Sequence, residues 1–368
     1  MTAKNKKRVV VAMSGGVDSS LAAALLTEQG YDVIGMTMRL WVADEFEDEA
    51  KQSSRGCCSL SSVEDARKVA DKMGIPYYVV NFKEQFRQKV VDYFIDQYRQ
   101  GRTPNPCIAC NRYMKFDLLL QRALDLEADY LATGHYARVS YDRNKQRYRL
   151  QKAKDAAKDQ TYALYNLTQE QLAHTLFPLG GYLKSEVRQL AADYGLAVAT
   201  KPDSQEICFI PDNDYKRFLK EESELTAEPG PILDGAGNQL GTHQGLVNYT
   251  VGQRKGLGLA VGKPMFVVKL DLDRNQLIVG EDKDVYFSSL IAADCNYILL
   301  ADLTAPLPVK VKIRYHAQET AGIVTPLTRG HVRVDFAEPE RAVTPGQSVV
   351  FYQGQDVLGG GIIQEAIR

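Results

Sequence analysis

The sequence lacks the features that mark several classes of protein. It has no run of about eighteen apolar residues, which excludes a membrane-spanning helix. It has no internal repeat and no low-complexity tract, which excludes a solenoid and a tail of biased composition. Its formal net charge of −1 provides no global attraction to nucleic acid, although a local basic face remains compatible with it. What remains is an ordinary globular composition, 45% hydrophobic and 25% charged.

Cysteine is also scarce, with six in 368 residues. The first residues, "MTAKNKKRVVVAMSGG", contain a short apolar run that ends in a glycine turn rather than at a small-residue cleavage site, so they indicate a strand and not a signal peptide. We therefore expect a cytoplasmic protein with no membrane partner. In that compartment cysteines are catalytic, metal-binding or inert more often than they form structural disulfides.

Strands and helices alternate over the first half of the chain. The β-branched run "RVVVAM" predicts a strand buried on both faces, and "LAAALLTEQG" predicts a helix that ends at Gly30. This order predicts an α/β fold with a doubly wound parallel sheet through about residue 200, which binds ligands at the carboxyl ends of its strands. Further strands are expected at "YDVIGMTM", "PYYVVNF" and "ADYLATGHY", and further helices near 61–73, 83–99 and 115–127.

The composition changes after about residue 212, where glycines, prolines and short alternating strands replace the long helices. We expect three domains: a nucleotide-binding domain at 1–214, a small central mixed or β module at 215–288, and a C-terminal β-barrel at 289–368. The sheet domain is expected to carry the chemistry, because its strand ends bear the polar motifs "MSGG", "TMRLW" and "TGHY".

The stretch "SGGVDS", Ser14 to Ser19, lies between the first predicted strand and helix. Its two glycines allow a tight turn, and their N–H groups together with the helix N-terminus form an anion site that suits phosphate. Asp18 is a candidate ligand for Mg²⁺. The stretch lacks the lysine of G-x-x-x-x-G-K-[ST] and the spacing of G-x-G-x-x-G, and the alternative is a plain glycine-rich turn.

This loop resembles the pyrophosphate loop of the PP-loop ATP pyrophosphatases, which adenylate an oxygen so that a nucleophile can displace AMP. Further stretches, "GRTPNPCIACNRYMKF", "ATGHYAR", "KDQTYAL", "TKPDSQEICFIPDNDY" and "NYTVGQRKGLG", closely resemble the bacterial tRNA-uridine 2-sulfurtransferase family over almost the whole chain. The resemblance implies an ATP- and Mg²⁺-dependent enzyme that replaces the C2 oxygen of the wobble uridine of tRNA with sulfur. It also implies a sulfur-donor partner, a cysteine desulfurase or a sulfur-relay protein.

The chemistry fits the cysteines. A persulfide can deliver sulfur as a nucleophile, and a second thiol can release that sulfur by thiol–disulfide exchange. The resemblance implies that Cys208 carries the persulfide and that Cys110 is the second catalytic cysteine, both expected on loops. Cys57 and Cys58 are expected to be loop thiols without a role, and Cys295 a small buried hydrophobe.

The resemblance also assigns the binding residues. It implies that the ATP-contacting positions are Ala12, Met13, Ser14, Gly15, Gly16, Val17, Asp18, Ser19, Met38 and Gly134. It implies that the target base is held by Asn105, Pro106 and Cys107, and that tRNA is contacted by His135, Lys158, Asp159, Gln160, Arg314, Tyr315 and Gln347. Taken without the family, His135 is equally well explained as a core histidine, and "KDQ" as a solvated turn.

One position departs from the family pattern. Many members have aspartate where this chain has Cys107. Three hypotheses follow: Cys107, Cys110 and Cys208 hold a [4Fe–4S] cluster with an open iron position, Cys107 is a bystander beside a Cys110–Cys208 redox pair, or Cys107 and Cys110 form a local disulfide.

Overall fold

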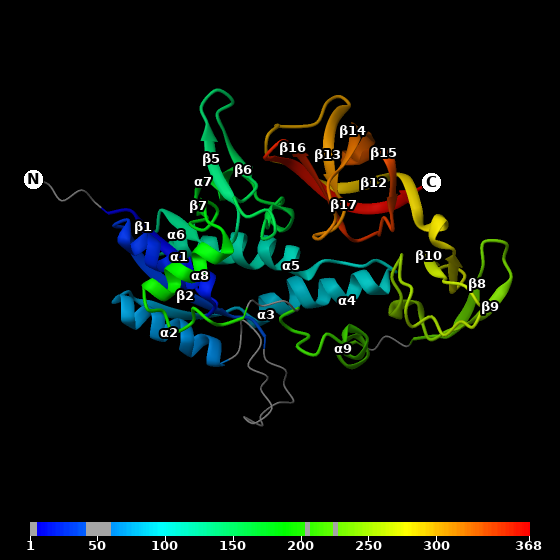
Figure 1. Ribbon diagram of the computed structural model, residues 1–368, viewed down its shortest axis with the longest axis horizontal. Coiled ribbons are helices and arrows are strands. Elements are labelled where there is room, and N and C mark those ends of the chain that lie inside the picture. Colours follow the sequence, from blue (N-terminus) through cyan, green and yellow to red (C-terminus); the bar gives the residue numbers. More distant parts are fainter. Residues whose placement is uncertain (1–5, 42–59, 203–206, 224–226) are drawn as a thin grey trace, which may run out of the picture. The chain divides into compact units, whose positions relative to one another are not determined.

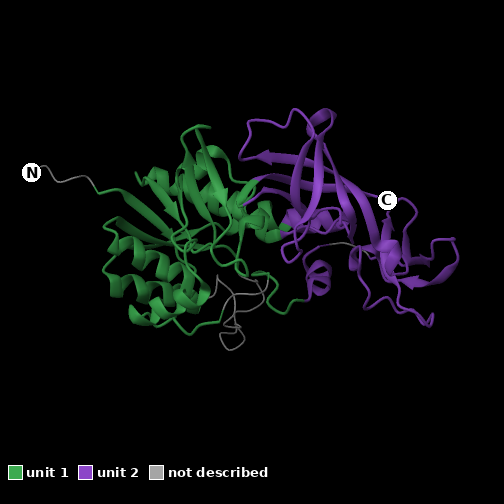
Figure 2. Cartoon of the chain, turned by 45° about the horizontal axis from the view of Figure 1, so that its top comes forward, with its two compact units in different colours: residues 1–91, 106–213, 355–357 green, residues 92–105, 214–354, 358–368 purple. Residues whose placement is uncertain are grey.

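The computed structural model describes residues 6–41, 60–202, 207–223 and 227–368 (Figure 1). Its contacts divide the chain into two compact units, drawn in green and purple in Figure 2. Unit 1 comprises residues 1–91, 106–213 and 355–357, and unit 2 comprises residues 92–105, 214–354 and 358–368. The expected boundaries at 214 and 288 stay a prediction. Among the described residues, no helix is long and apolar enough to cross a membrane.

Unit 1 is built on a five-stranded parallel sheet in the order β3-β2-β1-β4-β7. In the central strand β1 (Arg8–Ala12), Val9, Val10 and Val11 are fully buried, as expected of a strand covered on both faces. The predicted doubly wound α/β class is therefore confirmed for this unit. The other strands are β2 (Asp32–Arg39), β3 (Tyr77–Asn81), β4 (Tyr130–Ala132) and β7 (Thr175–Leu176).

The helices of unit 1 bury their apolar faces against this sheet. Leu21, Val69 and Val187 join one core cluster with Val9 and Val11, so α1, α2 and α8 share a core with β1. The α-helices are α1 (Val17–Glu28), α2 (Leu60–Met73), α3 (Lys83–Phe86), α5 (Pro106–Ala109), α6 (Leu120–Asp125), α7 (Gln169–Ala173) and α8 (Lys184–Asp193). Two π-helical segments, η1 (Arg87–Val91) and η2 (Cys110–Leu119), and the 3₁₀ turn η3 (Thr161–Ala163) complete it.

The helix expected near 115–127 begins earlier than the sequence pattern indicated. It starts at Pro106 and runs through α5, η2 and α6 to Asp125. Proline is favoured in the first turn of a helix, because its φ is already helical and its missing N–H is not needed there. The expectation that Cys110 lies on a loop is therefore wrong, since Cys107 and Cys110 both lie in the helical segment.

A β-hairpin that was not predicted follows the sheet strand β4. Its strands β5 (Arg138–Asp142) and β6 (Arg147–Gln151) pair antiparallel from Arg138–Gln151 to Asp142–Arg147. The Asp142 carboxylate closes the turn by accepting from the N–H groups of Asn144 and Lys145 at 3.0 and 3.2 Å.

The described part of unit 2 contains two β structures and the α-helices α4 and α9. The smaller sheet has the order β10-β11-β8-β9, with β8 parallel to β11 and the other pairs antiparallel. Helices α4 (Asp92–Arg99) and α9 (Tyr215–Glu222) pack through Tyr98 and Tyr215, whose rings stack at 5.2 Å. The small sheet is formed by β8 (Gly230–Leu233), β9 (Gln239–His243), β10 (Phe266–Asp271) and β11 (Gln276–Gly280).

The C-terminal strands of unit 2 form a closed barrel. The order β12-β15-β14-β13-β16-β17 is closed by pairing between β12 and β17, so the predicted β-barrel is confirmed. Leu290, Val334 and Phe351 are among its fully buried core residues. Its strands are β12 (Tyr286–Tyr297), β13 (Leu307–Lys312), β14 (Thr320–Pro326), β15 (Val332–Arg341), β16 (Ser348–Gln353) and β17 (Asp356–Ile367).

Candidate active site

The predicted nucleotide loop connects β1 to α1 at the carboxyl end of the central strand. Gly15 has a φ of 68°, and a Cβ on it would lie 2.1 Å from the carbonyl oxygen of Ser62, so only glycine fits there. Gly16 is the N-cap of α1. It has no side chain, so no N-cap side chain accepts from the N–H groups of the first turn. The loop thus keeps the geometry of an anion site.

The other predicted ATP positions lie on neighbouring strands. The Ser19 hydroxyl accepts from the Ser14 N–H at 3.1 Å and donates to the Gly16 carbonyl at 3.3 Å, which holds the loop closed. Gly134 follows β4, and a Cβ there would lie 2.7 Å from the Ser19 nitrogen. Met38 lies near the carboxyl end of β2. Because β2 and β4 flank β1, these residues share one edge of the sheet. Ala12 ends β1, and Met13 and Val17 are buried.

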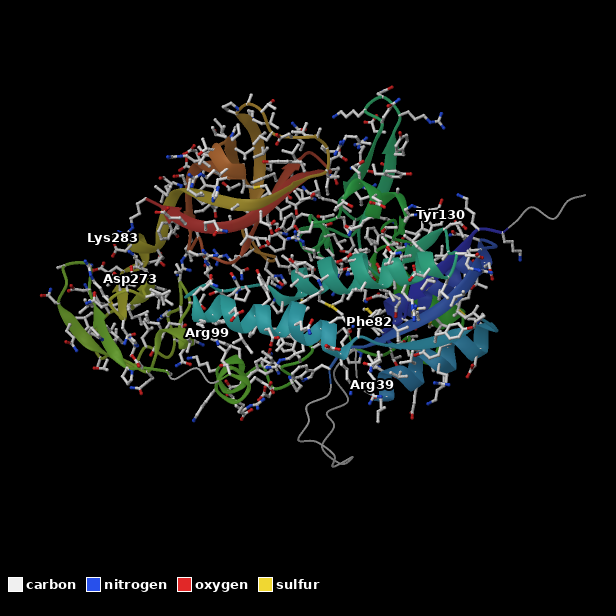
Figure 3. All side chains as sticks on the ribbon, turned by 180° about the vertical axis from the view of Figure 1, so that it is seen from behind. Arg39, Phe82, Arg99, Tyr130, Asp273 and Lys283 are labelled. Atoms are coloured by element: carbon white, nitrogen blue, oxygen red, sulfur yellow. The ribbon has the colours of Figure 1, made fainter. Side chains whose placement is uncertain are left out.

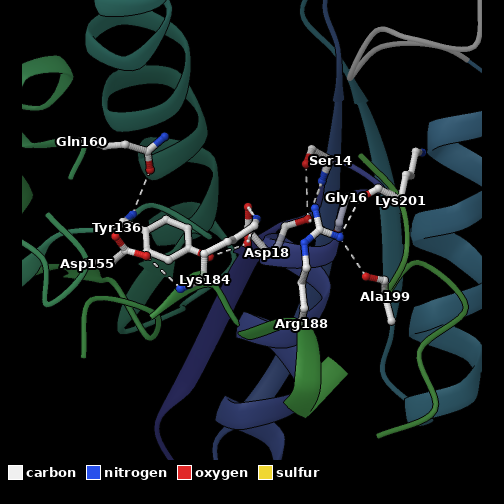
Figure 4. Close-up of polar contacts among 11 residues, drawn as sticks. Ser14, Gly16, Asp18, Tyr136, Asp155, Gln160, Lys184, Arg188, Ala199 and Lys201 are labelled. Carbon is white, nitrogen blue, oxygen red and sulfur yellow. Dashed lines mark hydrogen bonds and ion pairs between the residues drawn. The ribbon is translucent and has the colours of Figure 1, made fainter. Parts of the chain in front are cut away.

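Charged side chains from other elements surround this loop (Figure 4). The Lys184 ammonium donates to both oxygens of the Asp18 carboxylate, each at 2.7 Å. The Tyr136 hydroxyl also donates to Asp18 Oδ1, at 2.7 Å. The Lys201 ammonium donates to the Gly15 carbonyl at 3.0 Å and to Asp65 at 2.8 Å. Asp18 therefore meets two donors in the protein itself, and a Mg²⁺ ion there would have to share or displace them.

His135 connects the end of β4 to the helix that carries Cys110. Its Nε2 lies 3.4 Å from the Lys115 ammonium, which can only donate, so Nε2 accepts and Nδ1 carries the proton that it donates to Thr133 Oγ1 at 2.7 Å. Burial, aided by the Lys115 charge, holds the pKa of His135 well below its usual value, so the ring is neutral at pH 7. Lys115 also donates to Oδ1 of Asn111, the residue that directly follows Cys110, at 2.8 Å.

The cysteine helix packs on the α3–η1 segment of the same unit. Both α5 and η2 contact η1, and the Lys89 ammonium lies 5.4 Å from the centre of the Tyr113 ring. Cys107 is exposed, and Cys110 is half-buried as the first residue of η2. Helical spacing of three residues brings Cys107 and Cys110 to one side of this helix.

Cys208 lies in a turn next to the same segment. Its neighbour Phe209 is buried, with its ring 5.7 Å from that of Phe86 in α3 and 6.3 Å from that of Trp41 after β2. Phe209 thereby fixes the half-buried Cys208 at the carboxyl end of the sheet. The Cys110 and Cys208 segments, far apart in sequence, both pack on the α3–η1 helix.

Comparison with known proteins places the chain in a family. Residues 7–212 match the tRNA methyl transferase HUP domain, 216–281 the tRNA methyl transferase PRC-barrel domain, and 287–363 the aminomethyltransferase beta-barrel domain. A relative from Acetivibrio thermocellus, named tRNA-specific 2-thiouridylase MnmA, is 57% identical over 98% of this chain and 100% of its own. The chain belongs to the tRNA-specific 2-thiouridylase family.

Two further comparisons extend this result. A tRNA-specific 2-thiouridylase MnmA from Symbiobacterium thermophilum is 59% identical over 98% of this chain and 93% of its own. Among solved structures, a 4-thiouridine synthetase in complex with RNA and bound ATP covers 59% of this chain and 50% of that chain, at 18% identity and a TM-score of 0.37. The structural likeness is too remote to support an argument.

The predicted tRNA positions of this family member fall in both units. In unit 1, Asp159 accepts from the Ala153 N–H at 3.0 Å and from Thr161 Oγ1 at 2.6 Å, and Gln160 Oε1 accepts from the Tyr136 N–H at 2.9 Å. Lys158 is half-buried in the preceding turn, where its N–H donates to the Asp155 carbonyl at 3.1 Å. The Asp159 and Gln160 side chains therefore hold the backbone of this segment in place.

In unit 2, the segment before the cysteine helix is attached to the barrel. The Thr103 N–H donates to the Pro345 carbonyl at 2.9 Å, and the Thr103 carbonyl accepts from Gln347 Nε2 at 2.7 Å. This places Asn105, two residues on, near the predicted contact Gln347. Arg314 donates to the Arg341 carbonyl, and Tyr315 packs against His316 with ring centres 4.8 Å apart.

The three-cysteine cluster stays a prediction, because the described residues contain no ready-made group of ligands for it. Across residues 6–41, 60–202, 207–223 and 227–368, no three His, Cys, Asp or Glu side chains are grouped so that they could hold a metal ion. Cys107, Cys110 and Cys208 all lie within these ranges, so they do not form a preassembled cluster site in this conformation. Cys57 and Cys58 lie outside the described residues.

Sequence reasoning missed the residues that surround the nucleotide loop. Lys184 stands in "YLKSEVRQL" and Lys201 in "ATKPDS", and neither stretch matches a nucleotide motif. Tyr136 belongs to "ATGHYAR", which was noticed for Gly134 and His135 only. A signal was nonetheless present for Lys184. It is the first residue of a helix that follows a sheet strand in the chain, and such a residue lies near the carboxyl ends of the strands.

Proposed function

We propose that this chain is an ATP-dependent tRNA-uridine 2-sulfurtransferase that replaces the C2 oxygen of the wobble uridine with sulfur. The observation that carries the proposal is the 57% and 59% identity, over 98% of the chain, to proteins named tRNA-specific 2-thiouridylase. The site geometry supports it, because one sheet edge holds an anion-binding loop and the half-buried cysteines lie on segments beside the same sheet. We propose the cytoplasm as the compartment, because tRNA is there.

In the first step, ATP adenylates the C2 oxygen, and pyrophosphate leaves. Gly15, Gly16 and the first turn of α1 would hold the phosphates through backbone N–H groups, with the helix dipole favouring the negative charge. The close approach of Gly134 to Ser19 leaves no room for a side chain, so glycine is required where the segment after β4 packs against the start of α1. Mg²⁺ would neutralise phosphate charge at this edge, with Asp18 as the candidate acidic ligand.

In the second step, sulfur replaces the activated oxygen. A donor protein, a cysteine desulfurase or a sulfur-relay protein, would leave a persulfide on Cys208. The Cys110 thiolate then attacks the Cys208 sulfur, the terminal sulfur leaves as hydrosulfide and attacks C2, and AMP departs with the former C2 oxygen. This step leaves a Cys110–Cys208 disulfide, which an external thiol must reduce before the next turnover. Packing of both cysteine segments on α3–η1 supports this pairing.

Binding of tRNA is proposed to involve both units. Asn105, Pro106 and Cys107 would hold the flipped base, and Lys158, Asp159, Gln160, Arg314, Tyr315 and Gln347 would contact the RNA around it. His135 is better suited to positioning, because its ring lies 6.0 Å from both Phe116 and Phe177 and both ring nitrogens have partners. It would orient Lys115 and the helix that starts at Cys110.

The direct test is a reconstituted reaction. Purified protein is incubated with ATP, Mg²⁺, cysteine, a cysteine desulfurase, a thiol reductant and an unmodified tRNA transcript with a wobble uridine. We expect 2-thiouridine and AMP in equal amounts, measured by mass spectrometry of nucleosides and by chromatography. AMP release without any thiouridine, or a methylated nucleoside as the product, would overturn the proposal.

The nucleotide loop can be tested with a matched pair of glycine variants. Gly15 and Gly74 both have positive φ, 68° and 65°, but a Cβ on Gly74 meets nothing within 4 Å. Gly15→Ala should weaken ATP binding by about tenfold or more, because the added methyl group forces the loop away from Ser62. Gly74→Ala should cost about 1 kcal/mol of stability and leave ATP affinity unchanged. Equal ATP affinities would remove the loop from the binding site.

A further inference from the structure

The Asp18 carboxylate joins two side chains from different elements. Tyr136, on the loop after β4, donates its hydroxyl to Oδ1, and Lys184, the first residue of α8, donates its ammonium to both oxygens. The Lys184 side chain is 12% exposed and the Asp18 side chain 30% exposed, so water screens this pair only partly. Both donors therefore act directly on the one carboxylate in the nucleotide loop.

A first arm leads from Asp18 to the proposed RNA-contacting segment. Tyr136 is buried, and its backbone is held from both sides by Gln160. The Tyr136 N–H donates to Gln160 Oε1 at 2.9 Å, and the Gln160 N–H donates to the Tyr136 carbonyl at 3.0 Å. A shift of Gln160 therefore has to move Tyr136, and with it the hydroxyl on Asp18.

A second arm reaches the same segment by another route. The Lys184 N–H donates to Asp155 Oδ2 at 2.9 Å, while Asp155 Oδ1 accepts from the Ala157 N–H at 3.0 Å. The Asp155 carbonyl accepts from the Lys158 N–H at 3.1 Å. The turn that presents Lys158 thus also holds the start of α8, from which the Lys184 ammonium extends to Asp18.

The two arms leave residues 155–160 separately and converge on one carboxylate (Figure 4). We propose that Tyr136 and Lys184 are positioning residues that couple RNA binding at Lys158, Asp159 and Gln160 to the conformation and charge of the nucleotide loop. The inference rests on the proposed function, since it takes tRNA and ATP as the two ligands. When RNA moves the segment, the ammonium on Asp18 moves as well, which changes the positive charge available to phosphate at the loop.

A purely structural role makes a different prediction. A network that only stabilises unit 1 would lower the stability of the protein and leave the interaction between the ligands unchanged. A coupling network changes the affinity for one ligand when the other is bound, and this effect is reciprocal. The deciding quantity is therefore the ratio of nucleotide affinities with and without tRNA.

The test compares two tyrosine variants in the full-length protein. Affinity for α,β-methylene ATP, which resists cleavage, is measured by calorimetry with and without an unmodified tRNA transcript. In the wild type we expect tRNA to change the affinity by about fivefold or more, and in Tyr136→Phe we expect this factor to approach one. The control is Tyr194→Phe on the distal end of α8, which removes another tyrosine–carboxylate hydrogen bond, to Glu28, and should retain the wild-type factor.

The second arm has its own variants. Lys184→Met should abolish the coupling and weaken nucleotide binding, whereas Lys154→Met, which removes an exposed pair with Glu186 at 3.0 Å, should do neither. Asp155→Ala, which leaves every group on Asp18 in place, should lower the coupling factor without lowering affinity in the absence of tRNA. Thermal melts confirm that each variant is folded.

The outcomes separate this inference from the proposed function. The inference is overturned if Tyr136→Phe and Asp155→Ala both retain the coupling factor of the wild type. It is also overturned if tRNA does not change the nucleotide affinity of the wild type, even if the protein makes 2-thiouridine. A wild-type protein that makes no 2-thiouridine in the reconstituted reaction overturns the proposed function. The first result is a binding measurement and the second a product analysis, so each is obtained without the other.

Discussion

The described cysteines of the two units lie in different structural settings. In the barrel of unit 2, the half-buried Cys295 lies on strand β12 and packs against the core, and burial raises the pKa of its thiol to about 11. A Cβ on Gly361, on the adjacent strand, would lie 2.8 Å from its sulfur, so the backbone of that strand covers one side of the thiol. In unit 1, Cys107 is exposed on a helix, and Cys110 and Cys208 are half-buried at a helix segment and in a turn.

The contrast shows that the supporting element decides what a thiol can do. A thiol that packs against the core of a closed barrel is costly to ionise and acts mainly as a small hydrophobe. A thiol in a turn or near the start of a helix is placed where a partner can reach it. The described cysteines of unit 1, Cys107, Cys110 and Cys208, lie in such positions, whereas Cys295 lies within a strand of the barrel.

The largest expected effect divides the two groups by activity. Cys208→Ser and Cys110→Ser should each lower the rate of 2-thiouridine formation by about a thousandfold or more, because a hydroxyl neither carries nor releases persulfide sulfur. Cys295→Ser should retain the wild-type rate and lose only stability. The rates are measured with the reconstituted reaction under saturating ATP. Full turnover in Cys208→Ser would show that the persulfide role is wrong.

A smaller effect concerns the ionisation of Cys295. With a pKa of about 11, about 0.1% of this thiol is ionised at pH 8, against about a quarter of an unperturbed cysteine. A more basic thiolate is more nucleophilic, which offsets about tenfold of the rate lost through lower ionisation. Alkylation of Cys295 should therefore be at least about tenfold slower than alkylation of a model peptide thiol. Below its pKa the thiolate fraction rises tenfold per pH unit, so the rate should do the same between pH 8 and pH 10.

This rate is measured by iodoacetamide labelling and peptide mass spectrometry. Labelling in denaturant is the control, because the unfolded chain removes the burial, and Cys295 should then react as fast as the model thiol. Labelling of the folded protein at the model rate at pH 8 would contradict the comparison, since it would mean that the barrel does not shield Cys295.

Local features of the site could be predicted from the sequence. The loop at Gly15 and Gly16 was recognisable because strand, turn and helix are adjacent in the chain and only glycine permits the turn. The parallel sheet followed from buried β-branched runs such as Val9 to Val11. The barrel followed from short alternating strands. Each of these signals depends on residues within a few positions of one another.

Features that depend on distant pairs were not predictable. Lys184 reaches Asp18 only because α8 is packed beside α1, and no spacing in a single sequence encodes that contact. The helix start at Pro106 was missed because proline is equally common in loops, and the choice depends on packing of α5 on η1. The hairpin after β4 was missed because its strands, with Tyr141 half exposed, carry little apolar pattern.

The smallest expected effect concerns Cys107, the exposed member of the unit 1 group. Because no three-ligand group is present across the described ranges of the chain, we predict that Cys107 is a bystander to the proposed Cys110–Cys208 pair. Cys107→Ser should therefore change the rate of 2-thiouridine formation by about threefold at most, within the range of a surface substitution. Cys107→Asp, which gives the residue that the family resemblance leads us to expect at this position, should be at least as active as the wild type.

The contrary outcome for Cys107 is equally definite. Protein purified without oxygen is assayed for iron and sulfide before and after the substitution. Stoichiometric iron that is lost in Cys107→Ser, together with a fall in activity as large as that of Cys208→Ser, would mean that the three thiols come together in a conformation other than the present one. In that case the exposure of Cys107 would not identify it as a bystander. Only the inert role of Cys295 would remain from the comparison between the two units.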